Sequence, residues 1–167
     1  EPASLSVEVA RGVPVPAAGP PRIALLVDAT ASMRTAAVRG VSRLAAAQTR
    51  ALEILETAPE GTSLSVDVLG PGEGGDCRPS VLLPGDGRSP EVKGALLGLA
   101  PGGEGSLAES LDAVARGLRA TGGVDGTRVV VLTDLEERCG GDLCDAVAGL
   151  VDAGASVDFV VFGGRPT

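Results

Sequence analysis

Apolar and polar residues follow two different periods along this chain, and their order predicts an α/β domain. Period-two alternation and short apolar runs predict strands at residues 4–10, 23–27, 62–69, 80–83, 128–134 and 156–162. Apolar residues spaced three or four apart predict helices at residues 33–57, 90–100, 107–122 and around 146–151. We therefore expect a doubly wound, mostly parallel sheet with one antiparallel edge strand and helices on both faces.

The N-terminal residues differ in composition from the rest of the chain. Residues 4–10 read as a half-buried edge strand, and residues 11–21 contain Pro14, Pro16, Pro20 and Pro21, which is typical of an extended linker. We expect residues 1–21 to form this strand and linker, and residues 22–167 to form the compact domain.

Composition narrows the function classes. Hydrophobic residues make up 44% of the chain, but Phe159 and Phe162 are the only aromatic residues, so the core must be aliphatic. A net charge of −8 argues against nucleic acid as a partner, and no apolar run reaches the roughly 20 residues that insertion into a membrane requires. Histidine is absent, which excludes Ser-His-Asp and Cys-His catalysis within this chain.

A group of oxygen-bearing side chains follows the first strand of the predicted domain. Asp28, Thr30 and Ser32 stand on alternate residues after the apolar run 23–27, and Asp134 ends the strand at 128–134. Hard divalent cations take such oxygen ligands, and parallel sheets gather ligands at the carboxyl ends of their strands. The spacing indicates a metal site, whereas Asp28 by itself is equally consistent with a turn or helix cap.

These residues resemble the signature of a von Willebrand factor type A domain, a fold of the Rossmann-like class. The resemblance implies a metal-ion-dependent adhesion site in which Asp28, Thr30, Ser32 and Asp134 hold Mg²⁺, Mn²⁺ or Ca²⁺. It also implies that a Glu or Asp carboxylate of a protein partner completes the coordination. The function expected from it is cation-dependent protein binding, without enzymatic activity.

The family's fifth ligand, a threonine in a later loop, is replaced here by Gly105. Its neighbour Ser106 could supply a hydroxyl, and the carboxylate of Glu104 could approach the cation instead. Smaller departures are Ala31 and Leu135, at positions where the family commonly has glycine. An alternative function is therefore a scaffold with the same fold and no cation.

Three cysteines allow one disulfide and one remaining thiol. Two segments resemble a bacterial branch of the family whose members look exported or envelope-associated. They are Gly-Asp-Cys, which ends at Cys77, and Cys-Gly-Gly-Asp-Leu-Cys, which runs from Cys139 to Cys144. That resemblance implies an extracytoplasmic location and permits a disulfide between Cys139 and Cys144, the alternative being two buried thiols. A zinc site lacks a fourth cysteine or a histidine. Family domains also usually continue beyond the last strand seen here, so either the C-terminal part of the domain is missing or the strand at residues 4–10 replaces some of its cover.

A third hypothesis is a Mg²⁺-dependent phosphotransferase or phosphatase with Asp28 as the nucleophile, because carboxylates at strand ends also serve phosphoryl transfer. Such enzymes usually carry a second aspartate two residues later or a lysine near the phosphate. Here residue 30 is threonine, and the only lysine, Lys93, falls on a predicted surface helix.

Overall fold

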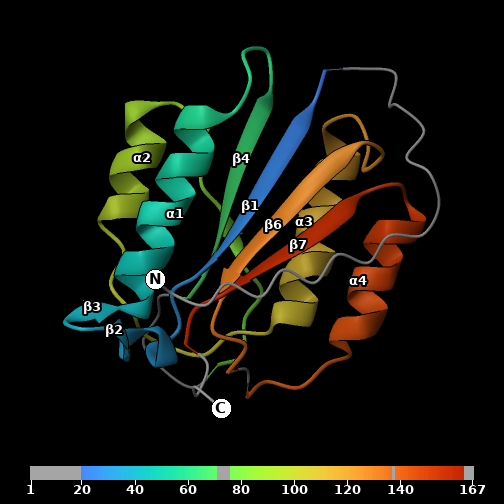
Figure 1. The fold of residues 1–167 in the computed structure, drawn as a ribbon. Helices are drawn as coiled ribbons and strands as arrows, with labels where there is room; N and C mark the ends of the chain where they lie inside the picture. The colour runs from blue at the N-terminus through green and yellow to red at the C-terminus, as the bar shows by residue number, and fades with distance from the viewer. Residues whose placement is uncertain (1–19, 71–75, 137, 164–167) are drawn as a thin grey trace.

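The computed structural model describes residues 20–70, 76–136 and 138–163, which form a twisted five-stranded sheet between two helical layers (Figure 1). The strand order is β5-β4-β1-β6-β7. The bounds are Arg22–Asp28 for β1, Ser63–Leu69 for β4, Val81–Leu82 for β5, Thr127–Thr133 for β6 and Ser156–Val161 for β7. All pairings are parallel except that of β5 with β4 at the edge. The predicted fold class is confirmed.

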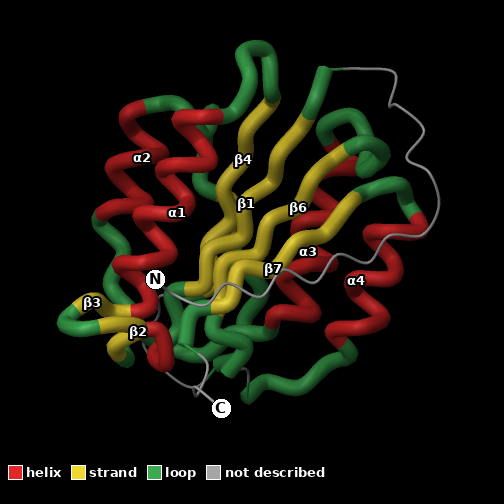
Figure 2. The backbone as a smooth tube through the Cα atoms, in the orientation of Figure 1, coloured by secondary structure: helices red, strands yellow, loops and turns green. Residues whose placement is uncertain are grey.

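Helices cover both faces of the sheet, as Figure 2 shows. Helices α1 (Arg43–Thr57) and α2 (Pro90–Leu97) pack on one face, and α3 (Leu107–Ala120) and α4 (Leu143–Asp152) pack on the other. Each face buries a separate apolar cluster, and each cluster contains one phenylalanine among aliphatic side chains. Within the described residues, no helix is long and apolar enough to cross a membrane.

The segment between the first strand and α1 differs from the single helix expected over residues 33–57. A short 3-10 helix (η1, Ala31–Arg34) leads into a hairpin of β2 (Ala36–Val38) and β3 (Val41–Ser42), and only then does α1 begin. Gly40 takes a φ of 74° in the hairpin turn, where L side chains are disfavoured. The Ser42 hydroxyl accepts a hydrogen bond from the Ala45 N–H at 3.0 Å, which caps the N-terminus of α1.

The strand predicted at residues 4–10 and nearly all of the linker lie outside the described residues. The boundary between residues 1–21 and the domain therefore stays a prediction. The antiparallel pair expected from residues 62–69 and 80–83 is confirmed as β4 and β5.

Asp67 is a carboxylic acid buried inside β4, with only 7% of its surface exposed. Burial raises its pKa to about 6 from a usual value of 3.8. The folded protein therefore holds the proton of Asp67 more tightly than the unfolded chain does. The stability that this proton contributes is present below the pKa of the unfolded chain and is lost as the pH rises through about 6. We expect Asp67→Asn to raise the free energy of unfolding by up to about 3 kcal/mol at neutral pH and by roughly 0.5 kcal/mol near pH 4.

Urea unfolding at the two pH values measures this difference. Asp112→Asn, at an exposed position on α3, is the matched control and should change stability at neither pH. An equal gain for Asp67→Asn at both pH values would contradict burial of the ionised carboxylate as the cause.

Candidate functional site

Oxygen-bearing side chains line a pocket of about 290 Å³ at the carboxyl end of the sheet. The lining includes four predicted ligands, Asp28, Thr30, Ser32 and Glu104, and adds the carboxylate of Glu136. Two backbone hydrogen bonds hold the loop after β1 against the loop before α3, from Gly102 N–H to Ala29 O at 2.9 Å and from Ala31 N–H to Gly103 O at 3.0 Å. The fold therefore brings residues about 75 positions apart to the two walls of one pocket.

Asp28, the last residue of β1, is 3% exposed and accepts hydrogen bonds on both carboxylate oxygens. The Thr30 hydroxyl donates to Oδ1 at 2.6 Å, and the Thr133 hydroxyl donates to Oδ2 at 2.6 Å. Burial raises the pKa of Asp28, the two hydroxyls oppose that shift, and the nearby Asp134 adds to it. A cation in the pocket would favour the ionised form of Asp28.

The hydroxyls of Thr30 and Ser32 are spaced as two ligands of one cation would be. Their oxygens lie 3.4 Å apart, and the Thr30 hydroxyl hydrogen points to Asp28, so its lone pairs stay available. Neighbouring ligands of octahedral Mg²⁺, at 2.1 Å from the metal, lie about 3.0 Å apart. The oxygens of Thr30 and Ser32 therefore lie about 0.4 Å farther apart than neighbouring ligands of one such cation.

Asp134 makes an ion pair with Arg43, the first residue of α1. The Arg43 Nη1 donates to Asp134 Oδ2 and to Glu136 Oε1, both at 2.8 Å, and the Asp134 side chain is 0% exposed. The Asp134 Oδ1 also accepts the Glu136 N–H at 2.9 Å. The structure therefore places Asp134 near Asp28 but binds its carboxylate to a guanidinium.

Gly105, at the position of the family's threonine ligand, has no room for a side chain. A Cβ there would lie 2.1 Å from Leu69 Cδ1 and 3.3 Å from Arg78 O. The neighbouring Ser106 does not line the pocket: its hydroxyl accepts the Glu109 N–H at 3.2 Å and donates to Gly140 O at 3.3 Å. Of the two substitutes predicted for the missing threonine, only Glu104 faces the pocket.

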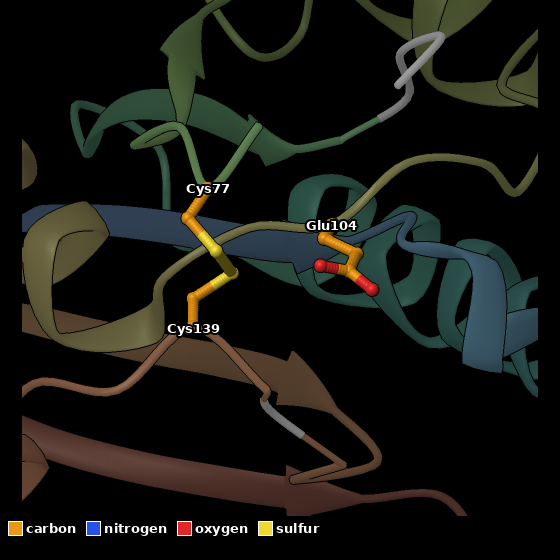
Figure 3. Close-up of side chains that lie close together, drawn as sticks. All are labelled: Cys77, Glu104 and Cys139. Atoms are coloured by element: carbon orange, nitrogen blue, oxygen red, sulfur yellow. A yellow bond between two sulfur atoms is a disulfide. The ribbon is translucent and has the colours of Figure 1, made fainter. Parts of the chain in front are cut away.

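The disulfide predicted between Cys139 and Cys144 is wrong. Cys139 is bonded to Cys77, 62 residues away (Figure 3). Cys144 is an exposed free thiol on α4. The bond ties the loop before β5 to the loop after β6, because both loops reach the N-terminal end of α3. Nearness in sequence favoured the wrong partner.

Comparison with solved structures identifies the fold. An aerotolerance-related membrane protein from Bacteroides fragilis, carrying multiple mutations to serine, superposes with a TM-score of 0.61 over 82% of this chain at 23% identity. A von Willebrand factor type A protein from Catenulispora acidiphila superposes with a TM-score of 0.59 over 82% of this chain at 17% identity. This chain has the fold of a von Willebrand factor type A domain. It spans 65% and 32% of those two chains, respectively.

No family model matches the sequence, and the search of curated proteins found no match. The solved structures thus confirm the resemblance to the type A domain for the fold alone. One local departure noted in the sequence has a structural counterpart: Leu135 takes a φ of 59°, the left-handed region that glycine tolerates best. Its N–H donates to the Thr133 hydroxyl at 3.0 Å, which holds the turn after β6 in this conformation.

Sequence reasoning missed two residues that bind the carboxylates of Asp28 and Asp134. Thr133 immediately precedes Asp134, so a hydroxyl beside a predicted ligand was the available signal. Arg43 looked like one of several arginines on the polar face of a helix, and nothing local marks it as the partner of Asp134, which is 91 residues away.

Proposed function

We propose that this type A domain binds a protein partner through a divalent cation held in the pocket. The observation that carries the proposal is the 3.4 Å spacing of the Thr30 and Ser32 oxygens in front of the buried Asp28. Hard oxygen donors at this spacing suit Mg²⁺ or Mn²⁺ better than softer cations. The cation would neutralise negative charge that Asp28, Glu104 and Glu136 bring to one pocket.

The partner group that fits best is a carboxylate of a protein. A cation held by the loop after β1 would have coordination positions that Thr30 and Ser32 do not fill, and an anionic oxygen of a partner could take one of them. Arg138 is exposed and lines the same pocket, so its positive charge also favours an incoming carboxylate. The disulfide supports an extracytoplasmic place of action, because such bonds persist in oxidising compartments.

A second candidate is a scaffold with the same fold that works without a cation. The ion pair of Arg43 with Asp134 favours it, because the guanidinium already supplies the positive charge that this aspartate would offer to a metal. Gly105 favours it as well, since the loop contributes no hydroxyl.

The proposal includes no catalytic step. A nucleophilic Asp28 would have to reach a phosphate, but this residue is 3% exposed and both its oxygens accept hydrogen bonds. Lys93, the only lysine, lies on α2, 3.7 Å from Glu56. These contacts favour a binding role for Asp28 over a nucleophilic one.

Thermal unfolding in Mg²⁺ or Mn²⁺ tests the cation. For a dissociation constant of about 1 mM, 10 mM cation would stabilise the domain by about 1.4 kcal/mol and raise its Tm by roughly 3 °C. We expect Ser32→Ala to lose most of this shift, because it removes one ligand oxygen and only a 3.4 Å contact with Thr30.

Ser63→Ala, at the opposite end of the sheet, should keep the full shift as the matched control. A wild-type Tm that does not respond to either cation would remove the cation from the proposal and leave the scaffold. A shift that survives in Ser32→Ala would place the cation elsewhere on the protein.

A further inference from the structure

The disulfide between Cys77 and Cys139 lies beside the carboxylate of Glu104 (Figure 3). One oxygen of Glu104 and the two sulfur atoms all lie within 4.8 Å of one another. Zinc binds thiolate sulfur at about 2.3 Å and carboxylate oxygen at about 2.0 Å, which puts tetrahedral neighbours roughly 3.5 to 3.8 Å apart. Once the bond between the sulfurs is broken, small side-chain movements can bring all three atoms to one metal.

We propose that reduction of this disulfide creates a site for a thiophilic divalent cation such as Zn²⁺ or Cd²⁺, with Cys77, Cys139 and Glu104 as ligands. Water would fill the fourth position, as in open tetrahedral zinc sites. A dithiol reductant supplies two electrons: it becomes a disulfide while Cys77 and Cys139 become thiols. Binding of the cation then releases one proton from each thiol.

Contacts that do not depend on the disulfide hold the two cysteines close together. The Ser106 N–H donates to Arg78 O at 3.3 Å, next to Cys77, and the Ser106 hydroxyl donates to Gly140 O at 3.3 Å, next to Cys139. One residue at the start of α3 therefore anchors both loops. We expect the thiols to stay near each other after reduction.

Exposure and charge also suit the proposed site. Cys77 is exposed, while Cys139 and Glu104 are half-buried, so a dithiol can reach the bond and a cation can enter. Two thiolates and a carboxylate carry three negative charges, of which the cation neutralises two. Arg138, adjacent to Cys139 and exposed, supplies positive charge at the same rim.

Cadmium titration of the full chain tests the site, with the ultraviolet absorption of the cadmium–thiolate bond as the readout. The protein is reduced with a dithiol, which is then removed without admitting oxygen. We expect the reduced wild type to bind one Cd²⁺ and the oxidised wild type to bind far more weakly. Cys77→Ser should abolish tight binding, and Glu104→Gln should weaken it by about tenfold by removing the ligand's charge.

Cys144→Ser is the control that separates two cysteine pairs. The proposal is wrong if this substitution removes the band while Cys77→Ser retains it, because Cys139 and Cys144 would then hold the metal. Unchanged affinity in Glu104→Gln, which keeps every cysteine, would also overturn it. The Mg²⁺ experiment uses the oxidised chain and a different residue, so failure of either result leaves the other standing.

Discussion

Arg43→Ala is expected to lower the free energy of unfolding by about 3 kcal/mol at neutral pH, because removing one partner leaves a buried charge uncompensated. The Asp134 side chain is 0% exposed and that of Arg43 is 11% exposed, so little water replaces the lost guanidinium. Chemical denaturation of both proteins at the same pH measures the difference. The matched control is Arg50→Ala on the same helix, whose pair with Glu53 is about half exposed and should contribute less than about 0.5 kcal/mol.

A second substitution identifies the cause of this loss. If the unpaired carboxylate is responsible, adding Asp134→Asn to Arg43→Ala should recover part of the stability, because the buried charge disappears with its partner. A double variant whose loss equals the sum of the two single losses would show that Arg43 acts through packing, not through its charge. Added Mg²⁺ offers another readout, since a cation can replace the guanidinium only if the pocket reaches Asp134.

Gly105→Thr, which restores the type A signature, is expected to destabilise the domain by about 2 to 3 kcal/mol. Leu69 pairs with Asp28 across β1 and β4, is 1% exposed, and already fills the space that a threonine would need. Extra atoms in a packed core force side chains and backbone to move. Thermal and urea unfolding measure the loss.

Leu69→Ala tests whether this contact is responsible. The double variant Leu69→Ala with Gly105→Thr should be no less stable than Leu69→Ala alone, because the threonine would occupy part of the cavity. Gly117→Thr on α3 is the control, since a Cβ there meets nothing within 4 Å. Losses that add in the double variant would contradict a clash with Leu69.

The sheet was predictable from sequence because buried parallel strands read as continuous apolar runs. Strand β6 was expected at residues 128–134 and observed at Thr127–Thr133. The β2–β3 hairpin was not foreseen, because Ala37, Val41 and Leu44 are spaced as on a helix and continue into a real one. Within this segment, only the turn residue Gly40 and the helix cap Ser42 indicate a hairpin followed by a helix and not one continuous helix.

The site was predictable only where its members are neighbours in sequence or follow strands. Asp28, Thr30 and Ser32 share one loop, whereas Glu104 was expected near them only from the resemblance, and two backbone hydrogen bonds between the loops hold it there. The pairing of Arg43 with Asp134 and that of Cys77 with Cys139 depend on the folded chain, because they join residues 91 and 62 positions apart. Local pattern carries no information about such partners.

The disulfide also determines how far the chain can be stretched by force. A pull on the two ends bypasses everything between Cys77 and Cys139, which together close a covalent ring. At about 3.5 Å per extended residue, the ring shortens the fully stretched chain by roughly 200 Å. Helices α2 and α3, strand β6 and the loop bearing Glu104 all lie inside it. Under tension, this half of the pocket therefore carries none of the pulling force along the backbone until the bond is reduced.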